Sequence, residues 1–246
     1  MKLYGLIGYP LGHSFSQKYF TQKFEKEKLD CRFENYPIEN IELFPGILET
    51  NPSLRGMSVT IPYKLKVISY LHEISPEVEH LNACNSIRIS DGKLTGYNTD
   101  TIGFEKSLLN KLQPWHTRAL ILGTGGASKA VEYILKKRGI EYTLVSRSPG
   151  DNVITYQDLS KDLVQQSLLI INASPLGTFP EVHTYPQIPY DGIGDQHFLF
   201  DLVYNPEKTI FLTKGEERGA VIQNGYDMLI NQAEASWEIW NAVEGM

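Results

Sequence analysis

The pattern of apolar residues differs between the two parts of the sequence. The clearer pattern begins at residue 119. From there on, continuous apolar runs alternate with segments in which apolar residues recur at helical spacing. Such runs are typical of strands buried on both faces, and strands built around them are predicted at 119–122, 142–146, 168–173, 198–203 and 220–222. Between these strands, helices are predicted at 127–138 and 209–218. This alternation predicts a doubly wound parallel sheet of the α/β class.

The first hundred residues show shorter and more varied elements. Strands are predicted at 3–8, 31–37 and 56–61, and Asp91-Gly92 between 86–90 and 93–96 is a strong hairpin signal. Helices are predicted at 14–28, 64–71 and 76–81, with a weak one at 38–48 that Pro45-Gly46 interrupts. These elements indicate a smaller, mixed α/β domain. Further helices are predicted at 101–112, before a joint at 113–115, and at 226–243.

Composition narrows the class of protein. The 246 residues fit one large domain or two small ones, and the net charge of −6 argues against nucleic-acid binding. Cys31 and Cys84 lack redox or metal spacing, which indicates a reducing compartment. The six histidines show no ligand spacing either, so no metal is expected. Since no leader or membrane span is evident, we expect a cytoplasmic protein without a membrane partner.

A glycine turn follows the strand at 119–122. Gly123 permits the tight turn, Gly125 lets the backbone approach a pyrophosphate, and Ser128 stands where the dinucleotide fingerprint has Gly or Ala. A strand before the turn and a helix after it favour a dinucleotide site. The alternative is a glycine-rich turn that binds no dinucleotide.

The end of the next strand bears on the choice of cofactor. NAD sites usually have Asp or Glu there, but this chain has Ser146-Arg147-Ser148. A guanidinium and two hydroxyls suit a 2′-phosphate, so NADP is favoured over NAD. The alternative is that Arg147 is a solvated side chain at a strand end.

Three other places offer polar groups for a site. Ser14 and Ser16 open a predicted helix, where both hydroxyls could bind one anion or one could simply cap the helix. Lys64 is predicted at a helix start, where the dipole opposes its charge and favours proton release. Its alternative is an ordinary surface lysine. Asp100 is either a carboxylate beside Lys64 or the N-cap of the helix predicted at 101.

These features together resemble the shikimate dehydrogenase family over nearly the whole chain. Each string is weak alone, but all occur in the family's order. The resemblance rests on GYPLGHSFS (8–16), SVTIPYK (58–64), ACNS (83–86), GYNTDTIG (96–103), GTGGAS (123–128), SRS (146–148), NASPLG (172–177), DLVYNP (201–206) and NGYDMLINQA (224–233).

The resemblance implies the reversible, NADP-linked reduction of 3-dehydroshikimate to shikimate, in the biosynthesis of chorismate and the aromatic amino acids. Lys64 and Asp100 match the catalytic pair, in which the lysine relays a proton and the aspartate orients it. The implied substrate-binding residues are Ser14, Ser16, Thr60, Asn85, Tyr204 and Gln232. The implied cofactor-binding residues are Gly123, Gly125, Gly126, Ala127, Ser128, Ser146, Arg147, Ser148, Ser174, Gly225 and Met228.

The family fold also implies two domains. A substrate-binding domain at 1–100 would be rejoined by the C-terminal helix at 226–246, and a Rossmann-like NADP-binding domain would span 101–225. The chain departs from the family at Ser58, usually Asn, at Pro175, and at Ser146-Arg147-Ser148, more often Asn-Arg-Thr. We expect a monomer or homodimer. Two alternatives stay open: an enzyme of the same type that uses quinate or accepts NAD, and a non-enzymatic ligand-binding protein on the same scaffold.

Overall fold

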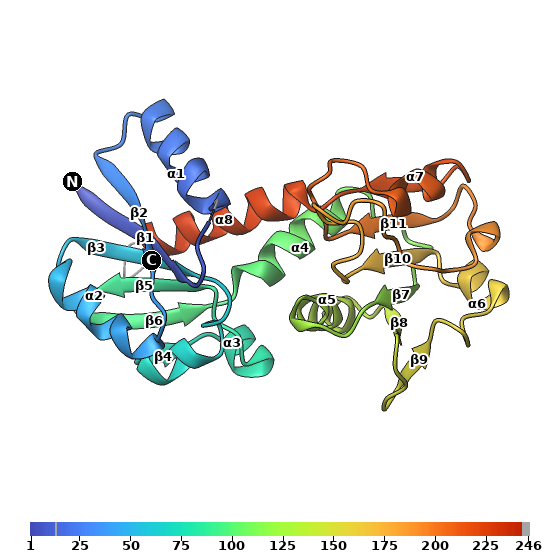
Figure 1. Cartoon of the computed structure of the whole chain (residues 1–246), viewed down its shortest axis with the longest axis horizontal. Helices are drawn as coiled ribbons and strands as arrows, with labels where there is room; N and C mark the ends of the chain where they lie inside the picture. Colours follow the sequence, from blue (N-terminus) through green and yellow to red (C-terminus); the bar gives the residue numbers. More distant parts are fainter. Residues whose placement is uncertain (13, 243–246) are drawn as a thin grey trace. The chain divides into compact units, whose positions relative to one another are not determined.

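The structure, a computed structural model, describes residues 1–12 and 14–242, which form two compact units (Figure 1). Unit 1 comprises Met1–Thr99 and the chain from Ala233 on, and unit 2 comprises Asp100–Gln232. The second boundary lies inside the last helix, α8 (Tyr226–Asn241), rather than ahead of it. Residues 243–246 of the predicted C-terminal segment lie outside the described residues.

Unit 1 contains a mixed sheet in the order β2-β1-β3-β5-β6-β4. β1 pairs in parallel with β2 and β3, β5 is antiparallel to both β3 and β6, and β4 joins β6 in parallel. Asp91 and Gly92 form the predicted hairpin turn at φ of 49° and 78°. The strands are β1 (Lys2–Gly8), β2 (Cys31–Pro37), β3 (Leu54–Val59), β4 (Glu73–Ile74), β5 (Ser86–Ser90) and β6 (Lys93–Tyr97).

Helices cover both faces of this sheet. Alternate residues of β1 point to opposite sides, so that Leu3 and Ile7 enter one core while Tyr4 and Leu6 enter the other. The first core is closed by residues of η1 (Ile41–Leu43), α2 (Phe44–Thr50), η2 (Lys66–Tyr70) and α3 (Pro76–Leu81). The second is closed by α1 (Phe15–Lys26) and α8.

The end of α8 completes the second core of unit 1. The Trp240 ring is 4% exposed and stacks on Tyr4 with ring centroids 5.2 Å apart. It also covers Gly56 so closely that an added Cβ would lie 2.2 Å from the indole. A glycine in the middle of β3 is therefore explained by the tryptophan that packs against it.

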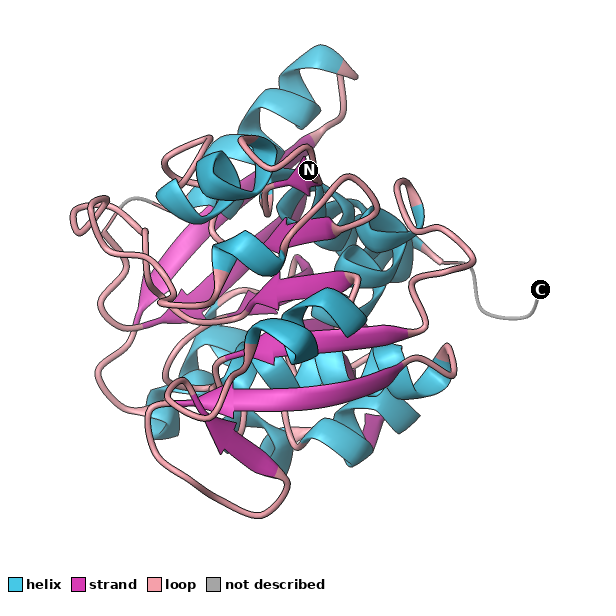
Figure 2. Cartoon of the chain, turned by 90° about the vertical axis from the view of Figure 1, so that its right-hand side faces the viewer, coloured by secondary structure: helices cyan, strands magenta, loops and turns pink. Residues whose placement is uncertain are grey.

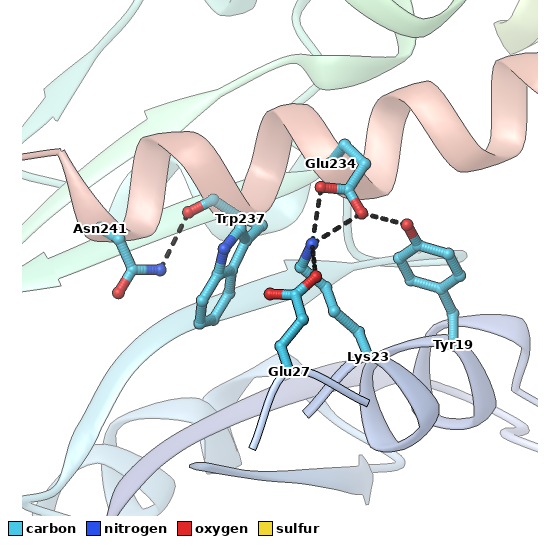
Figure 3. Close-up of polar contacts among 6 residues, drawn as sticks. All are labelled: Tyr19, Lys23, Glu27, Glu234, Trp237 and Asn241. Atoms are coloured by element: carbon cyan, nitrogen blue, oxygen red, sulfur yellow. Dashed lines mark hydrogen bonds and ion pairs between the residues drawn. The ribbon is translucent and has the colours of Figure 1, made fainter. Parts of the chain in front are cut away.

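A cluster of charged residues also joins α8 to α1 (Figure 3). Lys23 Nζ, on a side chain only 12% exposed, lies 3.0 Å and 2.9 Å from the two carboxylate oxygens of Glu234, and 2.9 Å from Glu27. The Tyr19 hydroxyl donates to the same Glu234 carboxylate. Burial lowers the pKa of Lys23, but the two carboxylates raise it more, so its net pKa lies above the usual value.

Unit 2 contains a parallel sheet in the order β12-β11-β10-β7-β8-β9, which confirms the predicted fold class. Along β7, Ala119 and Ile121 face a core closed by α4 and α5, while Leu120 and Leu122 face one closed by α6 and α7. Helices therefore cover both faces of the sheet, and they are coloured cyan around the magenta strands in Figure 2. The elements are α4 (Thr99–Leu109), β7 (Arg118–Leu122), α5 (Gly126–Lys137), β8 (Glu141–Ser146), β9 (Val153–Thr155), α6 (Lys161–Gln166), β10 (Leu169–Asn172), η3 (Tyr190–Gly192), β11 (Phe198–Asp201), α7 (Ile210–Glu216) and β12 (Val221–Gln223).

Three element predictions were wrong. No α-helix begins at Lys64: the carbonyl of Lys64 accepts from the Cys84 N–H at 2.7 Å, and only the 3₁₀ helix η2 follows. The helix predicted at 38–48 is a 3₁₀ turn followed by α2, with Pro45 in the first turn of α2, where proline is tolerated. Asp100 is not an N-cap, because α4 already begins at Thr99.

Candidate active site

Strand ends of unit 1 bring two of the predicted site residues to one edge of the sheet. The Thr60 N–H, just past β3, donates to the Ile7 carbonyl in β1 at 3.0 Å. The Asn85 carbonyl, just before β5, accepts from Val59 at 2.8 Å, and the Asn85 N–H donates to the Tyr97 carbonyl at 3.1 Å. Thr60 and Asn85 therefore lie on adjacent strands, at the edge where β1, β3 and β6 end.

Lys64 is held at this edge by its neighbours. Tyr63 is 1% exposed, and its hydroxyl donates to the Ile38 carbonyl at 2.5 Å, which anchors the turn after β3. The half-buried Lys64 follows directly, with its own carbonyl bonded to Cys84. Burial raises the pKa of the Cys84 thiol to about 12, and the Lys64 charge acts in the opposite direction. The absence of an α-helix start removes the dipole argument for Lys64, but the lysine lies just past a strand end, among residues predicted to form the site.

Asn85 joins this edge to the start of α4. Its side chain is 5% exposed, and its Oδ1 accepts from the Thr99 N–H at 2.7 Å and from the Thr99 hydroxyl at 3.2 Å. The Thr99 hydroxyl also lies 3.1 Å from the Ser236 hydroxyl of α8. Asp100 is the next residue, in the first turn of α4, where a carboxylate suits the helix dipole.

Ser14 is the N-cap of α1, and its Oγ accepts from the Gln17 N–H at 3.2 Å. Ser16 is the second residue of the helix and is half-buried. The capping interpretation is therefore correct for Ser14. A capping hydroxyl still has a hydrogen to donate, so an anion-binding role for either serine stays a prediction.

The glycine turn lies where the order of the unit 2 strands reverses. β8 and β10 flank β7 on opposite sides, and ligands of open α/β sheets bind beyond the carboxyl ends of the strands at such a point. Gly123 turns there at φ 115°, a conformation that disfavours other residues. Gly125, at φ −80°, caps the N-terminus of α5 without a side chain.

The turn fits a pyrophosphate. A Cβ added at Gly125 or Gly126 would meet no protein atom within 4 Å, so nothing in the protein itself requires glycine at these two positions. Glycine there leaves the first-turn N–H groups of α5 open to close approach by an anion. Ser128 is 1% exposed and bonds the Gly125 carbonyl at 2.7 Å, so it fits as the small third residue of the fingerprint.

The Ser146-Arg147-Ser148 segment follows β8 directly. Arg147 and Ser148 are exposed, and Ser146 is half-buried with its Oγ 3.5 Å from the Thr124 hydroxyl. The positive charge of Arg147 counteracts the effect of burial, which raises the pKa of Tyr156. An exposed guanidinium at this strand end is available to a 2′-phosphate.

The remaining predicted residues follow the other strands of unit 2. Ser174 comes after β10 and is half-buried, and Tyr204 comes after β11 and is 44% exposed. Gly225 precedes α8, and an added Cβ there would lie 2.2 Å from the Leu202 carbonyl oxygen, so packing alone requires this glycine. Met228 packs against the core that α4 and α5 close, and Gln232 Nε2 donates to the Leu229 carbonyl at 3.0 Å.

Thr99 and a buried polar network at the ends of β10 and β11 are functional candidates that sequence patterns did not predict. Asp201 and Asn172 are both fully buried, and they are joined through Asn172 Nδ2 and Asp201 Oδ1 at 2.9 Å. The signal was present, because a carboxylate ends the apolar run at 198–200. What the sequence did not contain was the identity of its partners.

In residues 1–12 and 14–242, no group of three or more His, Cys, Asp and Glu side chains is arranged to hold a metal ion. Across the same ranges, no helix has the length and apolar character to cross a membrane.

Comparisons with known proteins agree over most of the chain. Residues 6–87 match the family described as the shikimate dehydrogenase substrate binding domain. A relative from Methanococcus maripaludis, named shikimate dehydrogenase (NADP(+)), is 34% identical, covering 99% of this chain and 93% of its own length.

Solved structures give the same result. A shikimate 5-dehydrogenase from Listeria monocytogenes in complex with shikimate and NAD superposes with a TM-score of 0.88 at 25% identity, covering 98% of this chain and 91% of its own. One from Thermus thermophilus in complex with NADP(H) and shikimate superposes with a TM-score of 0.85 at 28% identity, covering 99% and 94%. Sequence and fold therefore agree along both units.

Proposed function

Because the chain belongs to the shikimate dehydrogenase family, we propose that it catalyses the reversible, NADP-linked reduction of 3-dehydroshikimate to shikimate. The reaction is a step in the biosynthesis of chorismate and the aromatic amino acids. Relatives named shikimate dehydrogenase (NADP(+)), matched over almost the whole chain, support both the activity and the cofactor.

The observation that carries the proposal is the set of bonds around residues 84 and 85. The Cys84 N–H fixes the carbonyl of Lys64, and the neighbouring Asn85 side chain fixes the main chain of Thr99. Asp100 follows Thr99 directly. One short segment thus organises the main chain at both members of the proposed catalytic pair, although they are far apart in the sequence.

In the proposed reaction, Lys64 protonates the oxygen that forms when the ring carbonyl is reduced. When bound, NADPH supplies the hydride. Asp100 orients Lys64 and the substrate hydroxyl, and in the reverse direction the same pair removes the proton. Ser14, Ser16, Thr60, Asn85, Tyr204 and Gln232 are proposed to hold the substrate, the two serines at its carboxylate.

The residues at the ends of the unit 2 strands would hold NADP. The open glycine turn and the first-turn N–H groups of α5 suit the pyrophosphate, and Arg147 with its two flanking serines suits the 2′-phosphate. Ala127, Ser174, Gly225 and Met228 are proposed to line the same site. Packing against Leu202 requires glycine at position 225 independently of a cofactor.

The experiment is a steady-state assay that crosses shikimate and quinate with NADP and NAD. We expect the highest kcat/KM with shikimate and NADP. A higher kcat/KM with quinate would assign a different substrate, and no turnover with any combination would favour a non-enzymatic ligand-binding protein.

The proposal extends to the protein's ligands, oligomeric state and cellular compartment. We propose small-molecule ligands, shikimate and 3-dehydroshikimate, with no nucleic-acid or membrane partner, and a monomeric or homodimeric state. Cys31 and Cys84 are free thiols, which is consistent with the reducing cytoplasm.

A further inference from the structure

Asp201, the last residue of β11, is a fully buried carboxylate with three hydrogen-bond donors. Its Oδ1 accepts from Asn172 Nδ2 at 2.9 Å and from the Val203 N–H at 3.0 Å. Its Oδ2 accepts from the Thr209 hydroxyl at 2.6 Å. Burial raises the pKa of Asp201 to about 6, with the three donors acting in the opposite direction.

One branch of this network leads to the loop that follows β10. Asn172, which ends β10, is fully buried, and its Oδ1 accepts from both the Ser174 N–H at 3.1 Å and the Ser174 hydroxyl at 2.6 Å. Asn172 Nδ2 also donates to the Leu176 carbonyl at 3.2 Å. The Asp201 bond therefore fixes the amide whose other end holds Ser174.

A second branch leads to α7. Thr209 is 1% exposed and is the N-cap of α7, with its hydroxyl oxygen accepting from the Leu212 N–H at 3.3 Å. In residues 1–12 and 14–242, no hydrogen bond of Thr209 goes to a residue proposed to bind NADP. Its Cγ2 lies beside Gly177, since a Cβ added there would lie 3.2 Å from it. It offers a matched control, because the Thr209 hydroxyl bonds the same carboxylate as Asn172 but caps α7, and Thr209→Val keeps the methyl group beside Gly177.

Burying a carboxylate costs free energy, and the three donors offset that cost. The donors alone do not explain why a carboxylate is placed here. The strand ends around Asp201 do. β10 and β11 are adjacent strands, and the Ser174 loop follows β10 beside the glycine turn, where the Ala173 N–H donates to the Leu122 carbonyl at 2.9 Å. A shift of the Asn172 amide would therefore move the chain next to the proposed pyrophosphate site.

We propose that Asp201 is a positioning residue for the cofactor: through Asn172 it fixes Ser174 in the geometry that binds NADP. The inference rests on the proposed function, which places NADP at the ends of the unit 2 strands. It goes beyond that function because it assigns the affinity for NADP partly to a buried carboxylate.

The test is calorimetric titration of the full chain with NADP in the absence of substrate. Asp201→Ala and Asn172→Ala each break the link to Ser174, and we expect the Kd for NADP to rise about tenfold, as for the loss of one well-oriented hydrogen bond. Asp201→Asn keeps an oxygen for the Asn172 amide and should recover most of the affinity. Thr209→Val should lower the melting temperature yet leave the Kd within about twofold.

A double-mutant cycle keeps the inference testable if Asp201→Ala does not fold. If Asn172 acts through Ser174, Asn172→Ala should change the Kd much less in a Ser174→Ala background than in the wild type. Additive effects, or an equal loss of affinity in Thr209→Val, would overturn the inference alone. A folded wild-type chain that binds no NADP would overturn the proposed function and the inference with it.

Discussion

Lys64 tests the chemistry at the scale of a single residue. Its backbone is fixed by Cys84 and its neighbour Tyr63 is buried, so truncation of its side chain should leave the turn intact. Lys64→Ala should lower kcat by roughly 10²–10⁴, the usual effect of losing a general acid or base. The KM for shikimate should change far less, because the other substrate-binding residues stay in place.

Lys64→Met is the matched control, since it keeps the aliphatic stem while removing the ammonium. It should be as slow as Lys64→Ala, with a melting temperature near that of the wild type. The measurement is kcat and KM for variants shown to be folded by thermal melt. If a folded Lys64→Ala enzyme kept kcat within a few-fold of the wild type, Lys64 would be an ordinary surface lysine.

Arg147 tests the choice of cofactor. Its side chain is exposed at the end of β8, so its replacement should not affect folding. Arg147→Ala removes a charge-assisted contact worth roughly 1.5–3 kcal/mol, so the KM for NADP should rise about tenfold or more while NAD kinetics change little. An equal loss with both cofactors would contradict a role at the 2′-phosphate.

Site residues could be predicted from the sequence where they lie in a recognisable motif. Their hydrogen-bond partners could not be predicted. Lys64 and Asp100 stood out because of the strings around them. Asp201 also lies in a family motif, DLVYNP (201–206), yet its partner Asn172 is 29 positions away and its role follows only from their pairing. From the sequence alone, a carboxylate at a strand end is expected to be exposed. Only the three-dimensional structure shows that Asp201 is buried.

At the scale of elements, the two serines at the start of α1 allow a capping role to be distinguished from substrate binding, because only Ser14 is the N-cap. Ser14→Ala removes the cap from Gln17 and should lower the free energy of unfolding by roughly 0.5–2 kcal/mol. Ser16 has no capping role, so Ser16→Ala should leave stability unchanged. Both should raise the KM for shikimate if both hydroxyls bind its carboxylate.

The control for the serine variants is the KM for NADP, which should not change. Thermal melts measure the capping effect independently of kinetics. A normal shikimate KM in Ser16→Ala would show that the second hydroxyl binds no substrate carboxylate, whatever the stability of Ser14→Ala.

The contact between α1 and α8 depends on a partly buried ion pair (Figure 3). In the described part of the chain, Glu234→Gln leaves Lys23, which is 12% exposed, with Glu27 as its carboxylate partner. We expect the free energy of unfolding to fall by roughly 1–2 kcal/mol, measured as a lower urea midpoint. Glu27→Gln removes the exposed carboxylate of the same lysine and should cost less than about 0.5 kcal/mol. Equal losses would show that Glu234 has no special part in joining the helices.

Long-range contacts decided which element predictions were correct. The strands at 31–37 and 86–90 were predicted accurately because alternation and the Asp91-Gly92 turn are local signals. The helix predicted from Lys64 was wrong because Cys84, from a distant segment, bonds the Lys64 carbonyl. α6 was not predicted because Val164 is its one buried residue, and short edge strands such as β4 carry almost no pattern.

At the scale of the whole molecule, the sequence predicts the sheet of unit 2 more completely than that of unit 1. Alternating strands and helices sufficed for the parallel sheet of unit 2. The order of strands in unit 1 was not predictable from local pattern, because the β5–β6 hairpin inserts between β3 and β4. Unit 1 is also discontinuous, since Trp240 completes a core built around Tyr4.

Stability against pH is a property of the whole chain. Asp201 and Glu105 are described carboxyl groups that contribute to it with opposite sign. Asp201 has a folded pKa of about 6, above its ordinary 3.8, so its contribution to stability falls as pH rises from about 4 to 6. Burial raises the pKa of Glu105, but Lys137 and Arg138 lower it more, so its net pKa lies below the usual value. Its contribution is present above the usual pKa and is lost as pH falls through the folded value.

The Asp201 effect can be isolated by comparison with a variant that cannot titrate. A shift of about 2 pH units corresponds to at most about 3 kcal/mol, so wild-type stability relative to Asp201→Asn should decline by up to that amount between pH 4 and 6. Urea unfolding of both proteins at several pH values measures this difference, and groups common to both, such as Glu105, largely cancel. The Tyr190 phenol interacts with Asp201, but its pKa lies above the usual value, so it stays protonated over this range in both proteins. A difference that stays constant with pH would mean that the three donors to Asp201 compensate fully for its burial, and that the carboxylate is ionised throughout this range.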